Sequence, residues 1–186
     1  MFRSDRPENY EEVYRGLVTR LREVDFAAVA PGLGTTTAPA GVALDLPFFS
    51  FLYRVNRDGV STAAGGATPD VAHRIVACYY VLHAGCGELS GEWVSYRDFR
   101  DSQFFMPAFR ASAEEKIARA FEGRKNELPA RAAALGGAPF AGPVDADASF
   151  RFAALPRIPL LLLFNDADED FPADARILFD RNAHLW

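Results

Sequence analysis

The chain has 186 residues, of which 49% are hydrophobic and 24% are charged, and its formal net charge at neutral pH is −5. This length and composition suit one soluble globular domain, and the acidic balance argues against a nucleic-acid binder, which normally presents a basic face. The two cysteines, Cys78 and Cys86, are too few to form a disulfide scaffold.

Two features of the sequence argue against export and membrane insertion. Residues 1–16 lack the apolar stretch of a signal peptide. The longest strongly hydrophobic run, Ile158 to Phe164, has seven residues, whereas a membrane-spanning helix needs about 20. We therefore expect a cytoplasmic protein without a membrane or nucleic-acid partner, and the sequence leaves its oligomeric state open.

The first half of the chain predicts a helix, a strand pair and a second helix. Apolar residues recur at helical spacing over 8–24, and a Gly/Pro/Thr loop follows over 30–41. Apolar alternation over 42–55 predicts strands, with Pro47 at a bend or an edge and a hairpin turn at 56–59. A helix over 68–85 is expected to begin at a Thr68 cap.

A glycine and the apolar pattern predict where the second helix ends and which of its faces is buried. Gly85 suits the residue that follows a helix. One buried stripe is expected along this helix, formed by Val71, Ile75, Cys78, Tyr79 and Leu82.

The second half predicts three helical segments and then two strands. Ser95 to Asp98 has a capping-box pattern that starts a short helix. A longer helix runs from about Phe109 to Gly123, and a shorter one covers 126–137. Strands are expected at 158–164 and 175–180, joined by an acidic loop over 165–174.

Helices and strands come in clusters rather than in strict alternation. This order favours an α+β fold, with a largely antiparallel sheet packed by several helices in a single globular domain over residues 1–186. We assume that the early and late strands join in one sheet.

The acidic loop contains Asp166, Asp168, Glu169 and Asp170, and it raises the alternative of a cation site. An EF-hand calcium loop needs acids at positions 1, 3 and 5, Gly at 6 and Glu at 12. Counted from Asp166, position 6 is Phe171 and position 12 is Ile177, which cannot fill those roles. We expect a solvated connection, with Phe171 and Pro172 folded back onto the core.

Other catalytic and metal patterns are weak. Among His73, Cys78, His83 and Cys86, only His83 and Cys86 are close in angle around the helix, and Cys86 lies beyond the Gly85 stop. This spacing cannot form a four-ligand zinc site. A single axial histidine to a bound cofactor stays open. The sequence has no nucleophile elbow, phosphate loop or dinucleotide fingerprint, and nothing in it identifies a cofactor.

Residues 91–99, "GEWVSYRDF", mix an acid, a base, Trp and Tyr after a helix stop. Binding pockets are typically apolar with a few convergent polar groups, so this segment is the candidate pocket. Its proposed lining is Glu92, Trp93, Tyr96 and Arg97, with His83 as a further cofactor-binding candidate. The alternative is that Trp93 only fills the core.

The segments "VACYYVLHAG", "GEWVSYRDF" and "LPRIPLLLLFNDADEDFPADARILFD" resemble domain-of-unknown-function family 3786. The resemblance runs from about Tyr10 to the end of the chain. Some members of this family of bacterial and archaeal domains, largely from anaerobes, are similar to partners of a four-cysteine iron–sulfur module. The family supplies no established catalytic residues.

This resemblance implies an accessory role in anaerobic redox, iron–sulfur or corrinoid-linked metabolism, with an iron–sulfur or corrinoid protein as partner. With two cysteines, the chain cannot itself hold a four-thiolate cluster. We therefore favour a soluble binding or accessory domain. The alternative is a small enzyme or cofactor-binding protein with a pocket around residues 91–99.

Overall fold

The computed structural model describes residues 7–38, 41–143 and 145–186. They form two compact units. Unit 1 takes the chain as far as Gly87 together with Leu155–Arg157 and Leu185–Trp186, and unit 2 takes Glu88–Ala154 and Ile158–His184. Helices are combined with two antiparallel sheets, which confirms the predicted α+β class. The expectation of a single domain over residues 1–186 stays a prediction.

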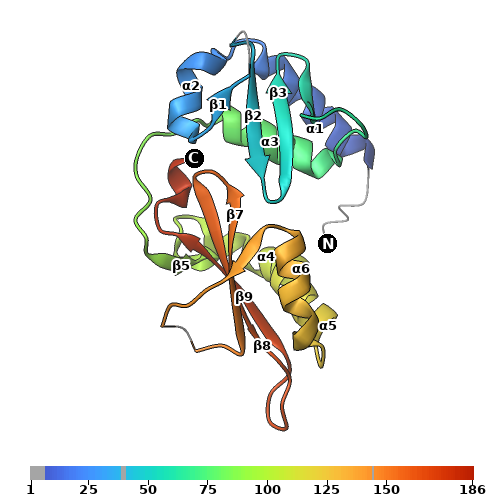
Figure 1. Ribbon diagram of the computed structural model, residues 1–186, viewed down its shortest axis with the longest axis vertical. Coiled ribbons are helices and arrows are strands. Elements are labelled where there is room, and N and C mark those ends of the chain that lie inside the picture. The colour runs from blue at the N-terminus through green and yellow to red at the C-terminus, as the bar shows by residue number, and fades with distance from the viewer. Residues whose placement is uncertain (1–6, 39–40, 144) are drawn as a thin grey trace. The chain divides into compact units, whose positions relative to one another are not determined.

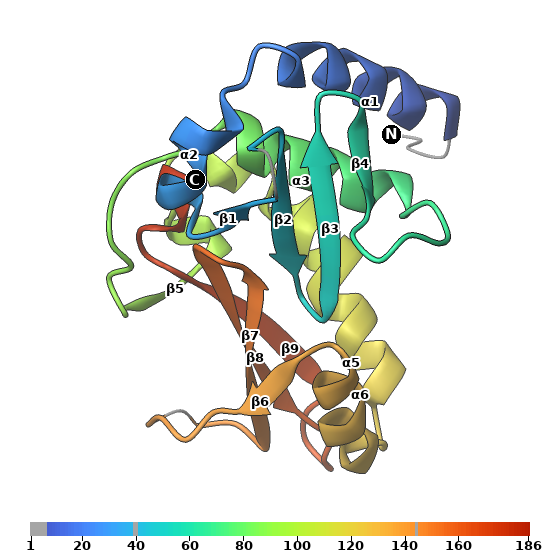
Figure 2. The same cartoon turned by 45° about the horizontal axis from the view of Figure 1, so that its top comes forward.

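Unit 1 is a four-stranded sheet with helices beside it (Figures 1 and 2). Figure 2 shows α3 lying across the sheet, and α1 packs against α3. The strand order is β1-β2-β3-β4, and all pairs are antiparallel. Its elements are α1 (Pro7–Leu21), α2 (Phe26–Leu33), β1 (Thr36–Thr37), β2 (Ala43–Phe48), β3 (Phe51–Asn56), β4 (Gly59–Thr62) and α3 (Val71–Leu82).

The strand pair predicted for residues 42–55 is confirmed as β2 and β3, and the turn predicted at 56–59 joins β3 to β4. Pro47 lies within β2, opposite Leu52 of β3. The short β1 pairs only with Leu44 and Asp45 on the other side of β2. Pro47 is therefore on the part of that edge that β1 leaves unpaired, where a residue without an N–H costs no ladder hydrogen bond.

Helix α2 overturns part of the loop predicted for residues 30–41. Asp25 caps this helix, because its Oδ1 accepts hydrogen bonds from the backbone N–H groups of Ala27 and Ala28, each at 3.1 Å. Gly34 ends the helix in the left-handed conformation that glycine adopts without strain. The cap residue Asp25 and the terminating Gly34 were both visible in the sequence, but Pro31 between them favoured a loop. Residues 39–40 of the predicted loop lie outside the described residues.

Helix α3 begins later than predicted and buries a different face. Its cap is Asp70, whose Oδ1 accepts from the N–H of Ala72 at 2.8 Å, and not Thr68. Tyr79 was placed in the buried stripe but is 43% exposed. The fully buried positions are Ala77, Cys78, Tyr80 and Val81. Because the helix is apolar on most of its surface, its periodicity does not define which side faces the core.

Unit 2 holds a five-stranded antiparallel sheet in the order β5-β9-β8-β7-β6. Three helices, α4 to α6, lie beside this sheet (Figure 1). The early and late strands therefore lie in two sheets, and the assumption of one sheet was wrong. The elements of unit 2 are β5 (Trp93–Ser95), α4 (Met106–Phe109), a π-helical segment (Arg110–Glu114), α5 (Glu115–Phe121), α6 (Leu128–Ala134), β6 (Gly137–Pro139), β7 (Ala148–Leu155), β8 (Ile158–Asn165) and β9 (Asp174–Asp180).

The predicted strands at 158–164 and 175–180 are confirmed as β8 and β9. The predicted capping box is also present, because Asp98 Oδ2 accepts from both the backbone N–H and the hydroxyl of Ser95, each at 2.8 Å. It starts the single 3-10 turn Tyr96–Asp98. Strand β7 was missed, although its Phe150 and Phe152 are buried and alternate with exposed residues.

Two late segments of the chain complete unit 1. The hydroxyl of Tyr80 on α3 donates to the carbonyl oxygen of Leu33 at 2.8 Å and accepts from the backbone N–H of Arg157 at 3.0 Å. Burial raises the pKa of Tyr80 to about 12. The indole Nε1 of Trp186 donates to the carbonyl oxygen of Gly32 at 3.0 Å. Helices α2 and α3 of unit 1 therefore rely on hydrogen-bond partners from much later in the sequence.

Glycine is required at position 85 for a reason other than the predicted helix stop. A Cβ at Gly85 would overlap the backbone carbonyl of Leu185. Backbone atoms cannot rotate away as a flexible side chain can, so the C-terminal segment would have to move. Gly16, in the middle of α1, has open space where its Cβ would lie.

We predict that Gly85→Ala and Gly16→Ala change stability in opposite directions. Gly85→Ala should lower the free energy of unfolding by roughly 1–3 kcal/mol, because overpacking displaces Leu185. Gly16→Ala should raise it by up to about 1 kcal/mol, because alanine is the better helix former. Urea unfolding followed by circular dichroism measures both. Equal stability of the two variants would contradict the role given to Gly85.

Candidate functional site

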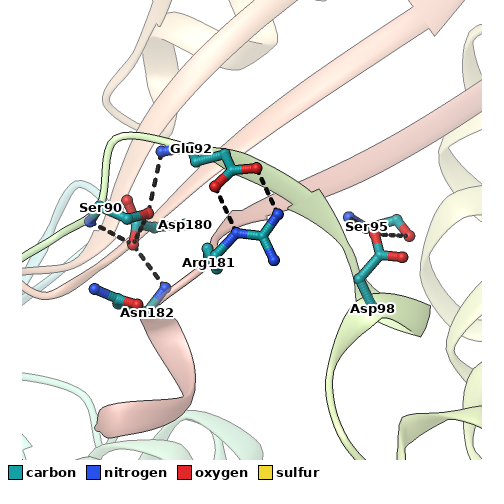
Figure 3. A network of polar contacts seen from close by, with 7 residues as sticks. All are labelled: Ser90, Glu92, Ser95, Asp98, Asp180, Arg181 and Asn182. Atoms are coloured by element: carbon teal, nitrogen blue, oxygen red, sulfur yellow. Dashed lines mark hydrogen bonds and ion pairs between the residues drawn. The ribbon is translucent and has the colours of Figure 1, made fainter.

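The polar residues around the predicted 91–99 pocket serve first to hold β5 against β9. Asp180, at the end of β9, is only 3% exposed. Its carboxylate accepts from the backbone N–H and hydroxyl of Ser90 and from the backbone N–H of Asn182, at 2.9–3.0 Å (Figure 3). It also accepts from the backbone N–H of Gly91 at 2.8 Å. Burial acts to raise the pKa of Asp180, but these hydrogen bonds outweigh it and the pKa is lowered. Asp180 is therefore a charged anchor inside unit 2.

Glu92 and Trp93 also have structural partners in unit 2. Glu92 forms a bidentate ion pair with Arg181 (Figure 3), and this hydrogen-bonded pairing lowers the pKa of Glu92. The half-buried Trp93 ring meets Phe140 edge to face, with 6.1 Å between ring centroids. The guanidinium of Arg151 lies 6.0 Å from the centroid of the Trp93 ring.

Tyr96 and Arg97 lie at two different cavities, although they are neighbours in sequence. Arg97 lines a cavity with several charged residues, and Tyr96 lines a mainly aromatic one. His83 is exposed and belongs to unit 1, where its Nδ1 lies 3.0 Å from the carbonyl oxygen of Tyr79. The structure thus does not gather the five predicted residues at one cavity, and their functional role stays a prediction.

The cavity lined by Arg97 and other charged residues has a volume of about 400 Å3 and is the strongest candidate site. We call it the arginine cavity, because three of its eight lining residues are arginines. It is lined by Ser95, Arg97, Met106, Arg110, Glu114, Asp174, Arg176 and Leu178.

Strand β9 supplies one wall of the arginine cavity through its alternation. Asp174, Arg176 and Leu178 are two residues apart, so they lie on the same face of the strand. Ser95 of β5 is opposite Leu178 in the register and therefore shares that face. These residues come from the two ends of unit 2 in sequence.

The π-helical segment Arg110–Glu114 supplies the opposite wall. π-Helical turns are rare and are frequently found at functional sites. The segment directs both Arg110 and the 9% exposed Glu114 to the cavity. Strand β5 ends at Ser95, opposite Leu178, so the preceding residue of β9, Ile177, has no partner in β5. The N–H of Ile177 instead donates to Glu114 Oε1 at 2.9 Å. Glu114 thus takes the place of a strand partner and ties the two walls together.

The arginines of the arginine cavity have carboxylates near them, in exposed and mostly loose ion pairs. Arg97 Nε lies 4.0 Å from a carboxylate oxygen of Asp98, and Arg110 Nε lies 3.7 Å from one of Glu115. Asp174 Oδ2 lies 3.1 Å from Nε of Arg176, and Asp174 Oδ1 lies 4.0 Å from an amino nitrogen of Arg110. The side chains of Arg97, Arg110 and Arg176 are 75%, 60% and 70% exposed, so solvent and solutes reach all three. Three exposed guanidinium groups converge on one cavity that Met106 and Leu178 also line, and this combination suits a small organic anion.

A second, mostly apolar cavity of about 380 Å3 also lies in unit 2. We call it the aromatic cavity, because four of its lining side chains are Phe or Tyr. It is lined by Tyr96, Phe99, Arg100, Asp101, Ser102, Phe105, Ile158, Phe179, Ala183 and His184.

The acidic loop is an exposed connection between β8 and β9, as predicted. Asp168 Oδ1 accepts from the backbone N–H groups of Asp170 and Phe171, so this acid organises its own turn. Asp166 Oδ1 accepts from the N–H of Gly123 at 2.6 Å, which lowers the pKa of Asp166. Phe171 is 71% exposed, so the prediction that it folds back onto the core was wrong.

The histidine and cysteine residues of α3 do not converge. Cys78 is fully buried, and burial raises its pKa to about 12, so it behaves as an apolar core residue. His73 Nδ1 lies 2.9 Å from the hydroxyl of Tyr53, and Cys86 is exposed. Within the described residues, no group of three or more metal-ligating side chains could hold a metal ion.

Sequence reasoning missed most of the arginine cavity. Arg110, Glu114, Asp174 and Arg176 line the cavity but were not among the predicted site residues. The alternation of Asp174 and Arg176 along a predicted strand placed both on one face, which was an available signal. Nothing in the sequence indicated the π-helical turn that brings Arg110 and Glu114 to them.

The chain belongs to the family described as domain of unknown function DUF3786, whose family model matches residues 25–186. The resemblance identified from the sequence is thereby confirmed. Neither a curated protein nor a solved structure matches the chain significantly. In the described part of the chain, no helix has the length and apolar character needed to cross a membrane.

We predict that Asp180→Asn destabilises the protein by roughly 1–3 kcal/mol at pH 7, because an amide cannot satisfy the same set of donors. The folded-state pKa of Asp180 is lowered, so the wild-type advantage is present above the unfolded pKa of about 4 and declines as the pH falls through the folded value. Denaturant unfolding of both proteins between pH 7 and pH 2 measures the difference. A gap that stays constant down to pH 2 would contradict an ionised anchor.

Proposed function

We propose that the chain is a binding module whose ligand is a small organic anion held in the arginine cavity of unit 2. The observation that carries this proposal is the convergence of Arg97, Arg110 and Arg176 on one cavity of about 400 Å3. Planar guanidinium groups bind carboxylates and phosphates through paired hydrogen bonds. Met106 and Leu178 provide an apolar surface for the carbon skeleton. A short dicarboxylate matches this combination.

Asp174 acts as an internal competitor in this proposal. Its carboxylate lies near Arg110 and Arg176, where a ligand carboxylate would bind. An incoming anion exchanges one carboxylate partner for another, so the cavity needs no large rearrangement to accept it. The same competition limits affinity, because part of the positive charge is already compensated.

The accessory role rests on the family resemblance. We propose a cytoplasmic domain that serves anaerobic redox, iron–sulfur or corrinoid-linked metabolism through an iron–sulfur or corrinoid protein partner. A four-thiolate cluster would belong to that partner, because this chain has two cysteines and Cys78 is buried in the core. The anion bound in unit 2 would then be a metabolite whose binding is sensed by the partner protein.

The alternative is a small enzyme or cofactor-binding protein with a pocket around residues 91–99. One observation favours it, because Ser95 and Arg97 of that segment line the arginine cavity beside the nearly buried carboxylate of Glu114. Glu114 is already engaged by the N–H of Ile177. A binding role therefore uses these residues as the structure places them, whereas a catalytic role requires Glu114 to leave its partner.

We predict that two substitutions in the arginine cavity change succinate affinity in opposite directions. Arg110→Gln should weaken binding by about tenfold, because it removes a charge-assisted contact. Asp174→Asn should tighten binding by about threefold, because it removes an exposed carboxylate that competes with the ligand for Arg176 and Arg110. Isothermal titration calorimetry at low ionic strength measures both, and added salt should weaken every complex.

The matched control is Arg131→Gln, which removes an exposed arginine of α6 that does not line the cavity. It should bind succinate as the wild type does. Equal losses in Arg131→Gln and Arg110→Gln would show that binding follows net charge alone and would contradict a defined site. Weaker succinate binding by Asp174→Asn would contradict the proposed competition between Asp174 and the ligand.

A further inference from the structure

The segment from Tyr96 to Arg110 contributes to both cavities of unit 2. It is a succession of short turns and helices rather than one regular element. Arg97, Met106 and Arg110 line the arginine cavity, whereas Tyr96, Phe99 and Phe105 line the aromatic cavity. Tyr96 stacks on Phe109 with 4.6 Å between ring centroids, so the two rings support each other.

The aromatic cavity is walled by rings that stand at angles to one another. Phe99 and Phe179 meet edge to face at 5.8 Å between centroids, and Tyr96 is tilted by 50° against Phe179. Rings in such positions present both faces and edges to a guest. A flat aromatic ring gains from stacked and edge-to-face contacts with them, beyond the gain from burial alone.

The lining of this cavity includes an exposed aromatic ring and a strained backbone position. Phe105, one of its lining residues, is 63% exposed, although a phenyl ring in water is unfavourable. Asp101, also in the lining, adopts a left-handed conformation with φ of 60°, which is uncommon for residues other than glycine. Such strained positions are concentrated at functional sites.

Two polar residues of the lining, Arg100 and His184, define the substituents that a ligand needs. Arg100 is 96% exposed, and its Nε lies 3.7 Å from a carboxylate oxygen of Asp101, so its guanidinium keeps donors for an anion. Nδ1 of His184 lies 2.9 Å from the carbonyl oxygen of Arg181. A carbonyl only accepts, so Nδ1 carries the proton and Nε2 of the neutral ring is an acceptor.

We infer that the aromatic cavity is a second ligand site, separate from the arginine cavity, which takes a small aromatic carboxylic acid. The ring occupies the space between Tyr96, Phe99 and Phe179, and the carboxylate meets Arg100. A ring hydroxyl, where the ligand has one, donates to Nε2 of His184. This site does not depend on the anion proposed for the arginine cavity, because the two linings share no residue.

The test uses four probes and the full-length protein, with binding measured by titration and mapped by two-dimensional NMR. Benzoate should bind, and 4-hydroxybenzoate should bind about threefold tighter through the hydrogen bond to His184. Cyclohexanecarboxylate has the same charge and similar size but no flat ring, and it should bind about fivefold more weakly than benzoate. Phenol lacks the carboxylate and should bind more weakly than 4-hydroxybenzoate.

Two adjacent phenylalanines provide the matched variants. Phe105→Ala should weaken benzoate binding by about fivefold, because Phe105 lines the cavity. Phe104→Ala should bind as the wild type does, because Phe104 is 79% exposed and does not line the cavity. Both residues are mostly exposed, so thermal melting should confirm that both variants fold. Arg100→Gln should reduce benzoate binding but leave phenol binding unchanged.

Arg110→Gln distinguishes this site from the one under the proposed function. It should weaken succinate binding and leave benzoate binding unchanged. Benzoate binding that disappears in Arg110→Gln and persists in Phe105→Ala would assign the aromatic acid to the arginine cavity and overturn the second site. Equal affinity for benzoate and cyclohexanecarboxylate, equal effects of the two phenylalanine variants, or no benzoate binding would also overturn it.

Discussion

The buried carboxylate of Asp180 receives four hydrogen bonds from three residues, and two of these residues lie about ninety positions earlier in the sequence. By binding Ser90 and Gly91, Asp180 fixes the start of β5 against the end of β9. The register that follows places Ser95 opposite Leu178. Both cavities of unit 2 depend on this register, because the segment that lines them begins where β5 ends.

The two faces of strand β9 line chemically different cavities. One face carries Asp174, Arg176 and Leu178 to the arginine cavity, and the next residue, Phe179, points to the other face and the aromatic cavity. The π-helical segment then adds Arg110 and Glu114 to the polar side. A shift of one residue in β9 would exchange the two faces and remove both cavities together.

The sequence predicted those features that short-range chemistry decides. The Ser95–Asp98 capping box, the turn before Gly59 and the strands β8 and β9 each depend on neighbouring residues, and all are present. The buried face of α3 could not be predicted, because that helix is apolar on most sides. The arginine cavity could not be predicted either, since it joins residues 97, 110 and 176 through a strand register and a π-helical turn. The predicted segment 91–99 contributes Ser95 and Arg97 to this cavity, whereas Glu92 is engaged by Arg181.

The central claim is that a small organic anion binds in the arginine cavity of unit 2, and residue-resolved NMR tests it most directly. In a titration of the 15N-labelled full-length protein with succinate at low ionic strength, amide resonances of residues 95–97, 106–114 and 174–178 should shift together along one binding curve. Those of β2 and β3 in unit 1 should stay in place. Shifts spread over exposed arginines in both units, or no saturable shift in the residues that line the cavity, would contradict the claim.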